Sequence, residues 1–109
     1  MNKKLLSKYI NADNFYILCR VNAIMRDIIR LKSENRSIGQ RINNLHQKRY
    51  EYIKVIKNNK GNKNILREYD KKVDSSINLE ILLTKLQKHN SKLILKNRNK
   101  IQELRKGLV

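Results

Sequence analysis

Hydrophobic residues recur in alternating steps of three and four over the first half of the chain. The positions on these steps are Ile28, Leu31, Asn35, Ile38, Ile42, Leu45, Arg49, Tyr52 and Ile56. A pattern sustained over about four heptads is typical of the seam of a coiled coil, the row of side chains that faces a partner helix. The spacing predicts a long helix over about residues 27–57. Its two polar seam positions, Asn35 and Arg49, cost stability and set the register.

A second stripe follows a run rich in Asn, Lys and Gly at residues 58–64. Asn and Gly accept left-handed backbone conformations, so this run predicts a turn. The stripe then resumes at Ile65, Leu66, Tyr69, Val73 and Ile77, and continues in a shifted frame at Leu79, Leu83, Leu86, Asn90, Leu93, Asn97, Ile101, Leu104 and Leu108. We therefore expect a return helix over residues 65–106, with a stutter or mild kink near residues 74–76.

Upstream of the long helix, a basic lead-in at residues 1–10 is followed by a helix start, where Asn11 or Asp13 provides the cap. Phe15 and Leu18, with Val21 and Ile24, give an apolar face and predict a short helix over residues 12–20. The expected fold is all-α, a long antiparallel coiled-coil helical hairpin preceded by a short N-terminal helix, within one domain over residues 1–109.

The composition agrees with helices and adds a strong charge. The chain has no Pro, three Gly and no Trp, and its 26 Lys and Arg against nine Asp and Glu give a formal net charge of +17. A small domain this basic most often binds nucleic acid. An anionic membrane surface or an acidic protein also fits the charge. The accumulation of Lys and Asn codons in an AT-rich genome is a further explanation, in which part of the charge has no function.

No catalytic constellation is visible, and the segment is expected to be non-catalytic and to hold no metal or cofactor. His46 and His89 have no partner at ligand spacing. Cys19 stands alone, which predicts a small buried thiol in a reducing compartment. The apolar runs are interrupted and no secretory signal is apparent, so we expect no membrane partner and a location in the cytoplasm or an organellar matrix rather than secretion.

Cations crowd the predicted turn and the helix ends beside it: Lys54, Lys57, Lys60, Lys63, Arg67, Lys71 and Lys72. Such a cluster contacts phosphates without reading sequence. Tyr52 and Tyr69 fit the seam by their spacing, whereas Tyr50 is off the seam and is the candidate for stacking on a base. A second basic run comprises Lys85, Lys88, Lys92, Lys96, Arg98, Lys100, Arg105 and Lys106. This run is either a polyanion-binding face or a solvated one.

The order of these parts resembles the N-terminal domain of seryl-tRNA synthetases. The matching positions of the long helix are Leu31, Glu34, Arg36, Ile38, Ile42, Leu45, Arg49, Glu51, Lys54 and Ile56. The start at residues 11–13, followed by Phe15 and Leu18, is similar to the family's capped short helix, and residues 59–61 match its hairpin tip. Tyr50 departs from the family's usual Asn and Ala12 from its frequent Pro. None of the catalytic domain's class II motifs is present.

The resemblance implies a tRNA-binding arm that lies between the TΨC loop and the long variable arm of serine tRNA and recognises shape and backbone. By position, the binding residues are Arg41, Lys48, Lys54, Lys57, Lys60, Lys63 and Arg67, with Tyr50 as the stacking residue. The parent enzyme would use ATP and Mg, and its catalytic domain would be a partner. Two alternatives remain: a stand-alone RNA-binding coiled coil, for example on an organellar ribosome, and a structural coiled coil that dimerises or docks on an acidic protein.

Overall fold

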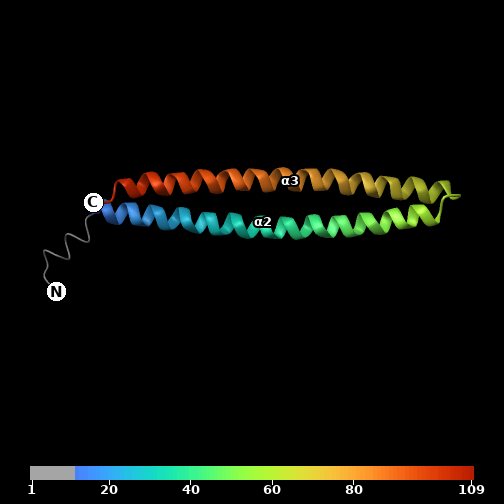
Figure 1. The fold of residues 1–109 in the computed structure, drawn as a ribbon, viewed down its shortest axis with the longest axis horizontal. Helices are drawn as coiled ribbons and strands as arrows, with labels where there is room; N and C mark the ends of the chain where they lie inside the picture. The colour runs from blue at the N-terminus through green and yellow to red at the C-terminus, as the bar shows by residue number, and fades with distance from the viewer. Residues whose placement is uncertain (1–11) are drawn as a thin grey trace. The chain divides into compact units, whose positions relative to one another are not determined.

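The computed structural model describes residues 12–109, in which two long helices are joined by a short turn (Figure 1). Helix α2 spans Ala12–Asn58 and helix α3 spans Lys63–Lys106. No strand occurs within residues 12–109. The two helices pack antiparallel, which confirms the predicted all-α helical hairpin. The predicted lead-in at residues 1–10 and the Asn11 cap lie outside the described residues.

Contacts between the helices divide this part of the chain into two units, each built from both helices. Unit 1 contains residues 12–33 and 90–109, and unit 2 contains residues 34–89. In unit 1 the side-chain amide of Asn14 donates to the backbone carbonyl of Val109 at 3.2 Å and accepts from its N–H at 3.2 Å. In unit 2 the side-chain amides of Asn35 and Gln87 each donate to the other residue's backbone carbonyl. Each unit is therefore an antiparallel helix pair.

The separate short helix predicted over residues 12–20 is wrong, because α2 continues without a break from Ala12 to Asn58. The seam extends upstream from Ile28 in the same steps of three and four, through Ile24, Val21 and Ile17. No Gly or Pro interrupts this stretch. Phe15 and Leu18, which the sequence placed on the buried face, are exposed.

The frame shift predicted in α3 is also wrong. The protected side chains of α3 alternate in steps of three and four without a shift: Leu66, Tyr69, Val73, Ser76, Glu80, Leu83, Gln87, Asn90, Ile94, Asn97, Ile101 and Leu104. Polar residues occupy several of these seam positions. Ile77 was placed at the end of the first stripe, and Leu79 and Leu86 in the shifted frame, but all three lie beside the seam and are exposed.

Unit 1 holds the largest cluster of buried aliphatic side chains within residues 12–109. Its members are Val21, Ile28, Leu31, Ile94 and Ile101, and Leu31 is 2% exposed. The cluster is flanked by one polar contact between the helices, in which the Asn97 side-chain amide donates to Asp27 Oδ2 at 3.2 Å. Burial of this aliphatic surface is the main favourable term that holds the two helices of unit 1 together.

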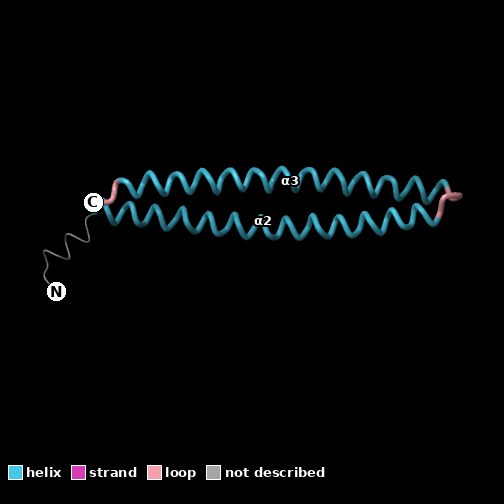
Figure 2. The backbone as a smooth tube through the Cα atoms, viewed as in Figure 1, coloured by secondary structure: helices cyan, strands magenta, loops and turns pink. Residues whose placement is uncertain are grey.

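The turn at residues 59–62 is the loop that joins α2 to α3 in Figure 2. Asn62 caps α3, because its Oδ1 accepts hydrogen bonds from the N–H groups of Asn64 and Ile65, each at 3.2 Å. At the other helix end, the Asn59 side-chain amide donates to the Val55 carbonyl at 2.8 Å. No residue within 12–109 has a positive φ. The turn is closed by a backbone hydrogen bond from the Asn62 N–H to the Asn59 carbonyl at 3.0 Å, and Asn side chains cap the helix ends beside it. It does not use the left-handed conformation that the sequence suggested.

Candidate nucleic-acid interface

The residues that the sequence singled out for RNA binding all lie in unit 2 and all have exposed side chains. Lys57 and Lys63 flank the turn and Lys60 lies within it, so the chain itself keeps them close together. Arg41 lies sixteen residues before Lys57 on α2, which places it about 24 Å away along the helix axis at 1.5 Å per residue. The eight predicted residues therefore fall into two groups. One surrounds the turn, and the second lies farther along α2, toward Arg41.

The second group lies beside shallow hollows between the two helices of unit 2. One hollow, of about 230 Å³, is lined by Arg41, Asn44, Leu45, Lys48, Leu79 and Leu83. A second, of about 310 Å³, is lined by Leu45, Lys48, Tyr52, Lys71, Lys72, Ser75, Ser76 and Leu79. Both hollows are lined by apolar side chains together with cations. Lys71 and Lys72 come to lie beside Lys48 only through the pairing of the helices, and they belong to the candidate interface although the residues chosen by position omitted them.

Aromatic rings of unit 2 are associated with lysines. The Lys54 ammonium lies 4.6 Å from the centre of the Tyr50 ring, and the Lys72 ammonium lies 4.5 Å from that of Tyr69. Tyr52 and Tyr69 meet edge to face, with ring centres 5.7 Å apart, and both are half-buried. Their predicted place in the seam is confirmed. Tyr50 is exposed, so a base stacking on the face that Lys54 covers must displace that cation.

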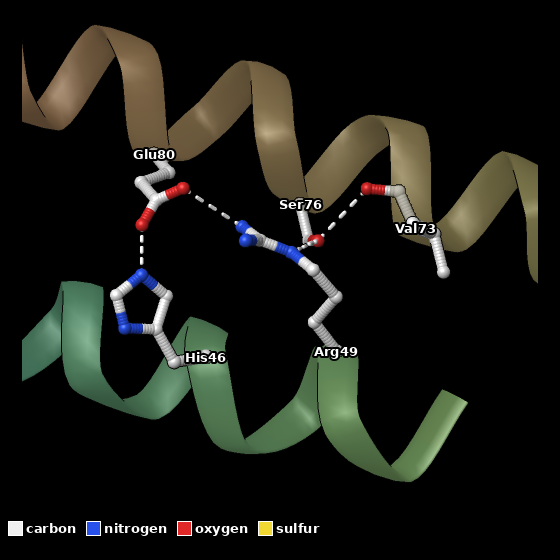
Figure 3. A network of polar contacts seen from close by, with 5 residues as sticks. All are labelled: His46, Arg49, Val73, Ser76 and Glu80. Carbon is white, nitrogen blue, oxygen red and sulfur yellow. Dashed lines mark hydrogen bonds and ion pairs between the residues drawn. The ribbon is translucent and has the colours of Figure 1, made fainter. Parts of the chain in front are cut away.

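Arg49 faces the seam of unit 2 and belongs to a polar network (Figure 3). Its Nε donates to Ser76 Oγ at 3.0 Å and its Nη2 to Glu80 Oε2 at 3.0 Å. His46 Nε2 donates to the other carboxylate oxygen of Glu80, and Ser76 Oγ in turn donates to the Val73 carbonyl at 2.8 Å. The hydrogen bond from His46, followed by that from Arg49, holds the pKa of Glu80 below its ordinary value. Arg49 is therefore part of a structural contact between the two helices of unit 2.

The seven predicted cations carry no such partner. None of them forms an ion pair with an acid inside the described part of the chain; the neighbouring Lys72 pairs with Glu68 at 3.6 Å. Unit 2 contains thirteen Lys and Arg against six acids, and residues 12–33 with 90–109 contain ten against three. Both units therefore have an excess of seven positive charges, so the basic character is not confined to the turn. An excess of exposed positive charge of this kind favours polyanions as ligands, and contact would be through point charges.

Other chemistry is sparse within residues 12–109. Cys19 is exposed, which corrects the prediction of a buried thiol, because position 19 lies off the seam that passes through Ile17 and Val21. No group of three or more His, Cys, Asp or Glu in the same residues is placed to hold a metal ion. None of the described helices combines the length and apolar character that are needed to cross a bilayer.

Comparison with known proteins gives no match to a family model, a curated protein or a solved structure.

Proposed function

We propose that this chain binds structured RNA, as the tRNA-binding arm of a seryl-tRNA synthetase that grips the elbow and the long variable arm of serine tRNA. The contacts are to backbone and shape, because the candidate surface consists mainly of exposed cations, which contact phosphates without reading base sequence. The segment contributes no catalytic group in this proposal. The parent enzyme's catalytic domain, which uses ATP and Mg, is its partner, and the site of action is the cytoplasm or an organellar matrix, where tRNA is charged.

The cations at the turn of unit 2 are the observation that carries the proposal. Lys57, Lys60 and Lys63 are exposed, lie within seven residues of one another and form no ion pair among the described residues. Like-charged side chains so close together repel each other unless a polyanion neutralises them. The order of helix, basic turn and return helix matches the arm that the sequence resembles.

A second candidate is a stand-alone coiled coil that binds RNA more generally. The specific observation in its favour is the spread of charge, since unit 1 has as large a positive excess as unit 2. A polyanion that contacts both units would give a salt dependence larger than the turn alone accounts for. The two candidates share the chemistry of phosphate contact and differ in their preference among RNAs.

Replacement of Lys57, Lys60 and Lys63 together by Gln tests the proposal. If the turn contacts phosphates, the affinity for a serine tRNA falls, and the slope of log affinity against log salt flattens by about two to three contacts at 0.7–0.9 per phosphate. The control is the triple replacement of Lys92, Lys96 and Lys100 by Gln, which removes the same charge from unit 1. Equal losses in the two variants would contradict a site at the turn, and helicity by circular dichroism verifies that both variants fold.

A further inference from the structure

Helix α2 has a second apolar stripe in unit 1, beside the seam and not part of it. Phe15, Leu18, Met25 and Ile29 lie at three-four spacing, with Asn22 at the remaining step. Their side chains are 62%, 49%, 42% and 64% exposed. Single exposed apolar residues are normal on a protein surface, but four of them aligned on one helix face over about four turns are typical of a surface that another element covers.

This stripe borders a groove between the two helices of unit 1. Met25, Ile28 and Ile29 of α2 and Ile101 of α3 provide the apolar part of a hollow of about 360 Å³. Its polar lining consists of Lys32, Arg98, Gln102 and Arg105. None of these three cations forms an ion pair within residues 12–109, and no acidic residue lines the hollow. The groove therefore combines an apolar lining with an excess of positive charge.

We propose that this groove and the stripe beside it, called the unit 1 docking face, bind an acidic amphipathic helix of another protein. A helix fits because its residues at i, i+3, i+4 and i+7 form a ridge that packs into a groove between two helices. Asp and Glu that flank such a ridge reach Lys32, Arg98 and Arg105 and neutralise them. The proposal depends on unit 1 alone and is independent of the RNA-binding function proposed for unit 2.

Charge complementarity distinguishes this occupant from the others. A second copy of the chain brings the same three cations to the interface, in a unit with ten Lys and Arg against three acids, and like charges opposed in an interface are unfavourable. RNA matches the charge but offers no aliphatic side chain to cover Leu18 and Ile29. An anionic bilayer covers exposed apolar residues yet provides no ridge to fill the hollow at Met25 and Ile28.

The test uses designed peptides as probes and the full chain as receptor. The first probe is a helical peptide about 20 residues long, a length at which helices begin to be stable, with a Leu stripe flanked by Glu. The second carries Lys in place of each Glu, and the third has the composition of the first in an order that destroys the stripe. We expect the acidic striped peptide to bind at least about tenfold more tightly than either control in fluorescence anisotropy.

Two receptor variants locate the binding. Leu18→Ser combined with Ile29→Ser should weaken binding of the acidic striped peptide by about tenfold or more, whereas Leu82→Ser, a change at an exposed leucine of unit 2, should have no effect. Both leave seam positions intact, and thermal melts verify this. The proposal is overturned if the acidic peptides bind equally, if the double variant binds like the parent, or if the double change instead abolishes self-association in light scattering or binding to anionic vesicles.

Discussion

Arg49 and Glu80 form an ion pair of 3.0 Å across the seam of unit 2, with side chains only 19% and 22% exposed. Hydrophobic residues usually occupy such positions in a coiled coil. Each side chain of the pair provides a hydrogen-bonding partner of the other. Loss of one partner therefore leaves a polar group in the seam without this contact, whereas loss of both removes the two polar groups together. This relationship determines how the seam of unit 2 responds to mutation and to pH.

Arg49→Leu is expected to lower the melting temperature, because Glu80 then stays in the seam without its main cation. Arg49→Leu combined with Glu80→Leu should melt at or above the temperature of the parent, since a partly buried ion pair is often replaced by packed aliphatic side chains without loss. Thermal melts of the parent, both single variants and the double variant measure the coupling. An Arg49→Leu variant with the same melting temperature as the parent would contradict a stabilising role of the ion pair with Glu80.

Acid should destabilise the hairpin through Glu80. Its pKa in the folded chain is lowered from the ordinary value of 4.5 by the hydrogen bonds from His46 and Arg49, so the unfolded chain binds the proton more tightly. The contribution of the ionised Glu80 side chain to the stability of the fold is present above pH 4.5 and is lost as the pH falls through the pKa of the folded state. Urea midpoints measured from pH 7 to pH 3 should fall less steeply in Glu80→Gln than in the parent. Parallel curves for the two proteins would exclude Glu80 as the source.

Leu31→Ala should destabilise the protein by about 2–5 kcal/mol, because it removes a fully buried side chain from the aliphatic cluster of unit 1 and leaves a cavity. Leu82→Ala is the matched control, since Leu82 is exposed and its truncation should change stability by less than about 0.5 kcal/mol. Equilibrium denaturation gives both values. Similar losses at the two positions would contradict the seam described for α2.

The sequence predicted α2 between residues 28 and 56 because aliphatic side chains mark most of its seam. In α3 it identified seam positions such as Val73 and Leu83 but was wrong between them and just beyond. There Ser76, Glu80 and Gln87 occupy the seam while Leu79 and Leu86 lie beside it. The hydrophobic pattern of one helix does not indicate which of its polar residues are buried, because their burial depends on a partner on the other helix.

The same limit applies to the candidate interface. Basic residues near the turn could be predicted from composition and order along the chain. The position of Lys71 and Lys72 beside Lys48 could not, because it depends on the register between α2 and α3. The ion pair between Arg49 and Glu80 likewise could not be predicted, because it depends on how the two helices pair.

The most direct test of the proposed function compares two tRNAs on the unmutated chain. Affinity is measured at near-physiological salt for a serine tRNA with a long variable arm and for a tRNA with a short variable loop. A shape-reading arm is expected to bind the serine tRNA more tightly, since backbone contacts along a long variable arm are absent from the other RNA. Equal affinity for the two tRNAs would contradict the synthetase-arm proposal.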